Sequence, residues 1–162
     1  MQIRLGLGFL PLDCGPMADN VADTLNQSLG GWNTAMGLRW VEATAERCVG
    51  ELTVAPIHTQ PYGIVHGGVH AGIIEAACST GAAVSAFARG QTVVGLENST
   101  SFIHAARGGT LTVTATPVTR GKRTQVWQGQ VTDEGGRVLA TGRVRLLCLE
   151  AGADLAGKPS GV

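Results

Sequence analysis

The sequence predicts an α+β fold in which a curved antiparallel β-sheet wraps around one long α-helix. Residues 64–88 carry no charge except Glu75, and their apolar residues recur every three or four positions, as in a helix buried on most sides. Four strand-like runs then follow one another through short glycine-containing turns. Strands joined by short turns favour antiparallel pairing, and the apolar helix then has to lie across that sheet.

Each element follows from its local pattern. An irregular arm at 1–18 precedes a short helix at 19–29, which is expected to end at Gly30-Gly31. Two strands at 36–43 and 47–56, a loop at 57–67 and the long helix from about 68 to 89 come next. Strands are then expected at 92–103, 110–120, 125–133 and 138–149. Residues 150–162 are rich in glycine, alanine and proline, which predicts a flexible tail after a single domain at 19–149.

Composition limits the function. The net charge is zero and only 15% of the residues are charged, which argues against nucleic-acid binding. No apolar run approaches the length of a membrane span. The four cysteines are widely spaced and form no C-x-x-C pair, which predicts neither a zinc site nor a redox motif. Together, these features lead us to expect a soluble, cytoplasmic protein with reduced thiols. So few charges leave much apolar surface to cover, which indicates an oligomer.

Three stretches resemble the hotdog-fold acyl-CoA thioesterases of the phenylacetate-pathway and 4-hydroxybenzoyl-CoA type. The first contains Gln60, the run from Gly63 to Gly68 (Gly-Ile-Val-His-Gly-Gly), Glu75 and Ser79; the others are residues 93–102 and 137–145. The likeness covers roughly residues 33 to 149. It implies the hotdog fold, a thioesterase activity without a cofactor, and an active site shared between two subunits.

Glu75 and Gly67 are the main catalytic candidates. A carboxylate within an apolar helix usually has a task, and no Lys or Arg lies within four residues to pair with it. Thioester hydrolysis needs a nucleophile or a base, and the resemblance implies that role for Glu75 through either direct attack or activation of water. Gly67 lies at the helix start, where a free N–H can bond a developing oxyanion. The resemblance implies the same role for Gly67.

The spacing of these two residues adds a prediction about assembly. Gly67 and Glu75 are eight residues apart in the sequence, which corresponds to about 12 Å along a helix. One carbonyl group cannot easily contact both residues of the same chain. We therefore expect a homodimer, or a homotetramer built as a dimer of dimers, in which the two residues come from different subunits.

The remaining candidates have weaker signals. Gln60 could donate to the substrate carbonyl, His66 could order the loop or contact the thioester, and Ser79 lies one turn beyond Glu75. Gly68, Asn98 and Ser99 are expected to bind substrate. His66 and His70 are spaced like zinc ligands but lack the glutamate of an H-E-x-x-H motif, so no metal is predicted.

For the phosphates of CoA, four cations at strand ends are candidates: Arg107, Arg120, Lys122 and Arg123.

The predicted function is hydrolysis of small or aromatic acyl-CoA thioesters. Two alternatives remain open at this stage. One is a hydratase or dehydratase on the same fold, and the other is a non-catalytic module that binds acyl-CoA.

Overall fold

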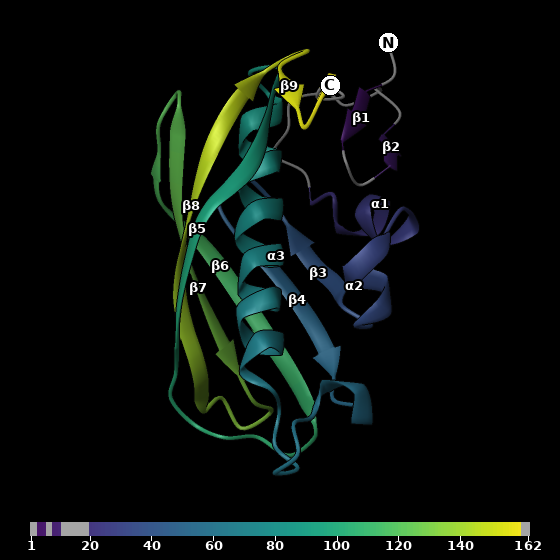
Figure 1. Cartoon of the computed structure of the whole chain (residues 1–162), viewed down its shortest axis with the longest axis vertical. Coiled ribbons are helices and arrows are strands. Elements are labelled where there is room, and N and C mark those ends of the chain that lie inside the picture. Colours follow the sequence, from purple (N-terminus) through teal and green to yellow (C-terminus); the bar gives the residue numbers. More distant parts are fainter. Residues whose placement is uncertain (1–2, 6–7, 11–19, 160–162) are drawn as a thin grey trace.

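The computed structural model describes residues 3–5, 8–10 and 20–159. Its main sheet has the strand order β3-β4-β6-β7-β8-β5, and every neighbouring pair is antiparallel. The six strands are β3 (Arg39–Ala43), β4 (Cys48–Thr53), β5 (Gln91–Phe102), β6 (Thr110–Arg120), β7 (Thr124–Thr132) and β8 (Val138–Glu150). The sheet curves around a 21-residue helix, α3 (Gly67–Phe87) (Figure 1). The α+β fold predicted from the sequence is confirmed.

Small residues let α3 approach the sheet closely. Ile73 and Ile74 of α3 are fully buried and contribute to the apolar core. A Cβ atom at Gly81 would lie 2.5 Å from the ring of Trp127 on β7, and one at Gly129 would lie 3.0 Å from Ile74. Glycine at these two positions therefore sets the distance between helix and sheet.

One face of α3 is only partly covered, although the sequence predicted a helix wrapped on most sides. Twelve of its 21 residues are buried, whereas a stripe at helical spacing keeps partial exposure. The stripe contains Gly72, Glu75, Ala76, Ser79 and Ala83. The carboxylate of Glu75 therefore lies on the face of α3 that a ligand or a second subunit can reach.

The two edges of the sheet differ. The β3 edge is closed by residues in and beside α1 (Ala22–Gln27): Asn26 accepts a hydrogen bond from Trp40 N and donates one to Trp40 O, each at 2.8 Å, and Asn20 accepts one from Ala43 N at 2.8 Å. The 12-residue β5 forms the other edge, and among the described residues only β8 pairs with it. An edge of this length is a site for pairing with another chain unless it is covered.

The later elements match their predicted limits within a residue or two, and the differences lie near the ends of the chain. The turn at Gly30-Gly31 does not simply end a helix, because Gly31 adopts a φ of +54° and begins a second short helix, α2 (Gly31–Ala35). The expected loop at 57–67 includes the end of a 3-10 turn, η1 (Pro56–His58). The described part of the chain contains no helix long and apolar enough to cross a membrane.

The two terminal segments form short antiparallel pairs where they are described. In the predicted arm, β1 (Ile3–Leu5) pairs with β2 (Gly8–Leu10), and the rest of 1–18 lies outside the described residues. In the predicted tail, β9 (Asp154–Leu155) pairs with β10 (Lys158–Pro159), and residues 160–162 lie outside the described residues.

Candidate active site

Two neutral donors hold the carboxylate of Glu75. Ser79 Oγ donates to Oε1 at 3.1 Å, and Asn98 Nδ2 donates to Oε2 at 3.2 Å. The same Asn98 amide donates to Ala71 O at 3.0 Å, and its Oδ1 accepts from Thr100 Oγ1 at 2.6 Å. No described Lys or Arg forms an ion pair with Glu75. The carboxylate is therefore oriented without being neutralised by a cation, as a base or nucleophile requires.

Glu75 opens onto a pocket of about 550 Å³, which we call the carboxylate pocket. Its floor is the partly exposed stripe of α3, and residues from α2 and the start of β5 complete it. Trp32 of α2 forms one wall and lies so close to α3 that a Cβ at Gly72 would come within 2.5 Å of the indole. A ligand in this pocket would therefore contact an aromatic ring and small side chains beside the carboxylate.

The start of α3 keeps one backbone N–H free. His66 is the N-cap residue, and its Nδ1 accepts from Gly68 N at 2.8 Å. This bond uses the Gly68 N–H within the helix cap, and the binding of substrate by Gly68 stays a prediction. Gly67 is the first helical residue, and its N–H donates to no described residue. It therefore remains available at the positive end of the helix dipole, and its role as an oxyanion donor stays a prediction.

Gly67 faces a second, smaller pocket of about 210 Å³, which we call the helix-start pocket. The ring of Phe102 lies against Gly67, where a Cβ would meet it at 2.9 Å. Gln60, His70 and His104 also line this pocket, and so do Ile64, Val65, Ile103 and Ala105. Gln60 and Gly67 thus line the same pocket, whereas Glu75 lines only the carboxylate pocket.

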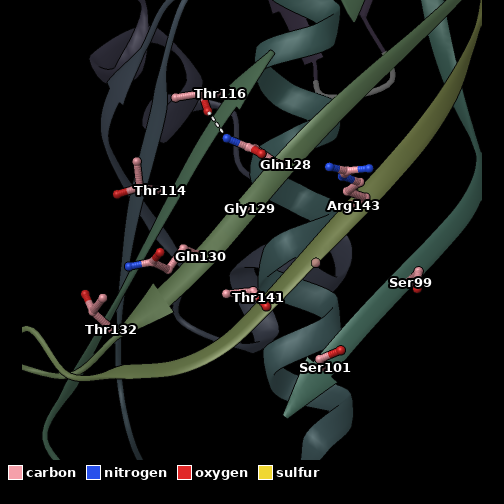
Figure 2. A pocket seen from close by; sticks show the side chains of 11 residues that line it. Ser99, Ser101, Thr114, Thr116, Gln128, Gly129, Gln130, Thr132, Thr141 and Arg143 are labelled. Atoms are coloured by element: carbon pink, nitrogen blue, oxygen red, sulfur yellow. Dashed lines mark hydrogen bonds between the residues drawn. The ribbon is translucent and has the colours of Figure 1, made fainter. Parts of the chain in front are cut away.

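Asn98 and Ser99 point to opposite faces of β5. Asn98 faces α3, where its amide donates to Ala71 O and to the Glu75 carboxylate. Ser99 lines a polar depression on the outer face of the sheet, with α3 behind the strands (Figure 2). Successive side chains of a strand alternate between faces, and this separates Ser99 from the other candidates within one subunit.

The four cations proposed for CoA phosphates do not form one cluster within the subunit. Arg107 donates to the carbonyl oxygens of Tyr62 and Gly63, just before α3 begins. Arg120 and Lys122 line a depression with Arg89, which follows the end of α3. A 21-residue helix is about 30 Å long, so the two groups lie at opposite ends of it.

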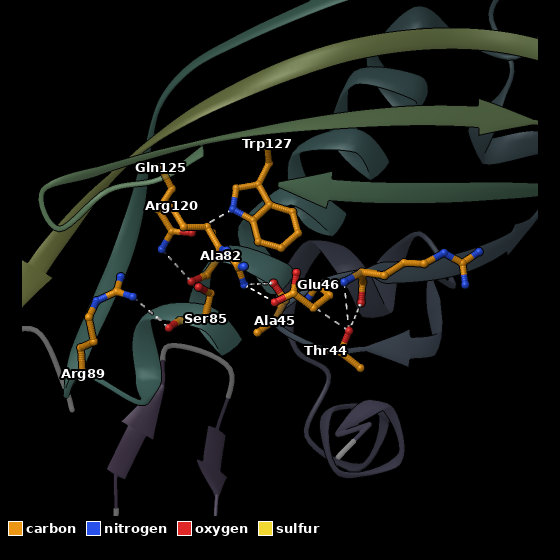
Figure 3. Close-up of polar contacts among 10 residues, drawn as sticks. Thr44, Ala45, Glu46, Ala82, Ser85, Arg89, Arg120, Gln125 and Trp127 are labelled. Carbon is orange, nitrogen blue, oxygen red and sulfur yellow. Dashed lines mark hydrogen bonds and ion pairs between the residues drawn. The ribbon is translucent and has the colours of Figure 1, made fainter. Parts of the chain in front are cut away.

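The cations near the end of α3 are partly engaged by the protein itself. Arg120 pairs with Glu46 and donates to Ala45 O, and Arg89 donates to Ser85 O (Figure 3). No described residue forms a hydrogen bond or ion pair with the Lys122 or Arg123 side chain. Of this group, Lys122 and Arg123 are therefore the cations most available to a phosphate.

The buried cysteines are not nucleophile candidates. Burial and, to a smaller extent, the nearby Glu75 carboxylate together raise the pKa of the Cys78 thiol to about 12. Burial also raises the pKa of the Cys48 thiol. Because thiolates rather than thiols are nucleophilic, both residues behave as small apolar side chains. The full burial of Cys78 agrees with this role.

Among the lining residues that were absent from the predicted site, Trp32, His70 and Phe102 have aromatic side chains that shape the two pockets. Trp32 was missed because α2 was not predicted. His70 was considered only as a metal partner of His66, and no described group of three or more His, Cys, Asp or Glu side chains could hold a metal ion. Its burial and its contact with β5 depend on tertiary packing, which the local sequence does not reveal.

Similarity to known proteins agrees with this geometry. Residues 62–140 match the thioesterase superfamily model. The chain is 34% identical over 113 residues to the 1,4-dihydroxy-2-naphthoyl-CoA hydrolase of Listeria monocytogenes, covering 70% of this chain and 91% of the relative. It is 34% identical over 122 residues to 1,4-dihydroxy-2-naphthoyl-CoA thioesterase 2 of Arabidopsis thaliana, covering 70% and 76%.

A solved structure supports the same assignment. A thioesterase from Haemophilus influenzae superposes with a TM-score of 0.77 at 25% identity, over 83% of this chain and 94% of that one. Together with an oriented carboxylate and a free N–H at a helix start, these similarities identify the chain as a hotdog-fold member of the thioesterase superfamily, a thioester hydrolase.

Proposed function

We propose that this protein hydrolyses small or aromatic acyl-CoA thioesters to the free acid and CoA. The observation that carries the proposal is that one helix, α3, holds both a carboxylate without a cation partner and a backbone N–H without an acceptor. Each opens onto its own pocket. The names of the Listeria and Arabidopsis relatives specify an aromatic acyl-CoA, which supports this substrate class.

In the proposed reaction, the Gly67 N–H donates to the thioester carbonyl oxygen as negative charge develops there. Gln60 lies in the same pocket and can donate beside it. Glu75 either attacks the carbonyl carbon or takes a proton from the attacking water, and Ser79 and Asn98 hold its carboxylate. The C–S bond then breaks, and the CoA thiolate leaves and takes up a proton. On the direct-attack route, water then hydrolyses the acyl-Glu75 anhydride, which releases the free acid and restores the carboxylate. His66 keeps the loop in position through its bond to Gly68.

We further propose that the complete site forms between two subunits. Glu75 and Gly67 open onto different pockets of one chain, so a single carbonyl group needs a second chain to meet both. The open β5 edge offers the contact, because antiparallel pairing of two β5 strands would satisfy its outer backbone groups and give a two-fold dimer. A dimer of dimers can be built from the same unit.

The position of the two-fold axis follows from contacts along β5. Glu75 contacts β5 at Gly95 and Asn98, and Gly67 contacts it at Phe102. In an antiparallel pair, the Phe102 end of one strand lies beside the earlier part of the other. Ser99 lies about midway along β5 between the Glu75 contacts and the Gly67 contact. A two-fold axis that passes close to Ser99 would therefore place Glu75 of one chain opposite Gly67 of its partner.

Replacement of Glu75 tests the catalytic assignment. Glu75→Gln keeps the shape of the side chain but removes its charge, so we expect CoA release from benzoyl-CoA and phenylacetyl-CoA to fall by at least about 100-fold. Thiol release is followed with a chromogenic disulfide, and circular dichroism checks the fold. Unchanged hydrolysis by this variant would show that Glu75 is neither nucleophile nor base. Binding without any hydrolysis by the wild-type protein would instead favour a binding module.

Subunit complementation tests the shared site. Co-expression of a Glu75→Gln chain with a Gln60→Ala chain gives heterodimers in which one of the two sites contains both wild-type residues. With random pairing of equal amounts, half of the dimers are heterodimers, so activity is expected to recover to about one quarter of the wild-type level. Each variant expressed alone is the control. No recovery in a verified heterodimer would place both residues in the same subunit's site.

A further inference from the structure

A buried histidine in the helix-start pocket has unused hydrogen-bonding capacity. His70 is 3% exposed, and its Nδ1 is buried without a partner. No hydrogen bond joins either nitrogen of this ring to another described residue. Buried polar groups in folded proteins almost always have partners, so an unpartnered imidazole that lines a pocket points to a partner on the ligand.

The surroundings of His70 define what that partner is. Burial lowers the pKa of His70, so the imidazole is neutral and has one donor and one acceptor nitrogen. No Lys or Arg is among the described residues that line the pocket, which makes it a poor site for an anionic group. A hydroxyl group is uncharged and can either donate or accept, so it suits either tautomer of the ring.

The pocket has the size and lining of an aryl site. Its volume of about 210 Å³ is somewhat larger than the roughly 150 Å³ cavity that holds a benzene molecule. Phe102 forms an aromatic wall, with its ring centroid 6.4 Å from that of His70. Ile64, Val65 and Ile103 add apolar surface. This space fits a single substituted ring next to the Gly67 N–H but does not fit the long pantetheine arm of CoA.

We propose that His70 is a specificity-determining residue that hydrogen-bonds a hydroxyl group on the aromatic ring of the acyl moiety. The proposal rests on the proposed acyl-CoA hydrolysis and on the placement of the acyl ring in the helix-start pocket. A pocket that provides a buried polar partner discriminates against an analogue lacking the matching hydroxyl, because that analogue leaves the imidazole unpaired.

The test compares benzoyl-CoA with its 2-, 3- and 4-hydroxy derivatives. We expect the wild-type protein to favour at least one hydroxylated isomer over benzoyl-CoA by about tenfold or more in kcat/KM. In His70→Leu this ratio should fall to about one or two, since the hydroxyl loses its partner. His70→Asn keeps a donor and an acceptor and should restore part of the preference.

A matched control uses the other buried histidine. His58 is also 3% exposed and has an unpartnered Nε2, but it does not line the pocket. His58→Leu should therefore leave the hydroxyl preference unchanged. If His70→Leu keeps the preference, or lowers kcat/KM equally for every substrate, the proposed role of His70 is wrong.

A binding measurement separates this inference from the hydrolytic function. Non-hydrolysable phenacyl-CoA thioethers, with and without ring hydroxyls, are titrated into the wild-type and His70→Leu proteins by calorimetry. Tighter binding of a hydroxylated thioether that disappears in His70→Leu supports the role of His70 even if no thioester is hydrolysed. Equal binding of all thioethers by the wild-type protein overturns the inference, whereas absence of hydrolysis alone overturns only the proposed activity.

Discussion

The carboxylate of Glu75 owes its orientation to residues that carry no charge. Ser79 and Asn98 each donate one hydrogen bond, and the Asn98 amide is itself fixed by Ala71 O and Thr100. A cation in their place would bind the carboxylate more strongly but would also reduce its basicity and nucleophilicity. Neutral donors thus set the direction of the side chain while leaving its charge available to the reaction.

Substitution of Asn98 tests this arrangement at the level of one residue. Asn98→Ala removes the donor to Oε2, and we expect kcat for benzoyl-CoA to fall by about tenfold with little change in KM, because the carboxylate loses its fixed direction. Thr116→Ala changes a residue of β6 on the outer face of the sheet and should alter kcat by less than about twofold. Equal losses in the two variants would contradict the assigned roles.

The position of α3 on the sheet depends on a buried polar contact as well as on small residues. Gln125 is fully buried, donates to Ala82 O at 3.1 Å and accepts from Trp127 Nε1 at 2.9 Å (Figure 3). This contact fixes the Trp127 ring beneath Gly81. Trp32, by contrast, lies over Gly72 on the open face and is 43% exposed.

Two glycine substitutions distinguish the closed face of α3 from its open face. Gly81→Ala places a methyl group against the immobilised Trp127 ring, and we expect the free energy of unfolding to fall by about 2 kcal/mol or more. Gly72→Ala meets Trp32, which can move into solvent, so the change should stay within about 1 kcal/mol, helped by the higher helix propensity of alanine. Urea unfolding measures both. Similar losses would show that Trp32 is held as firmly as Trp127.

At the level of elements, the sequence predicted the regular parts of the chain best. The limits of β5 to β8 agree with the predicted strands within one residue at each end, because alternating patterns and glycine turns are local signals. The helix α2 was missed because its start depends on a left-handed Gly31, and glycine pairs are usually read as breaks. The four candidate cations for the CoA phosphates lie in two groups within one subunit, because strand order and helix length separate Arg107 from the others.

For the whole molecule, the contrast between the two sheet edges is the main guide to assembly. Residues in and beside α1 close the β3 edge with asparagine side chains, whereas the described residues leave the outer edge of β5 uncovered. A second copy paired there would extend the sheet across the dimer. It would also bring the carboxylate pocket of one subunit beside the helix-start pocket of the other.

Cysteine cross-linking tests this assembly. With the axis close to Ser99, the two copies of that residue would have Cα atoms about 5 Å apart, within the range of a disulfide. Ser99→Cys should therefore form a covalent dimer under mild oxidation. Ser101→Cys should not, since its two copies would be offset by four residues, or about 13 Å along the strands. Non-reducing electrophoresis reports both, and cross-linking only in the Ser101→Cys protein would contradict the proposed axis.

The sequence by itself determined the α+β fold, the long helix, and the two candidates Glu75 and Gly67, because periodicity, glycine placement and an isolated carboxylate are properties of local sequence. Only the tertiary structure decided which groups these residues meet. It placed Asn98 on the carboxylate, used the Gly68 N–H in the His66 cap, and directed Ser99 to the outer face. It also buried His70 against Phe102. These outcomes depend on contacts between segments that lie far apart in the sequence, which the local sequence does not encode in readable form.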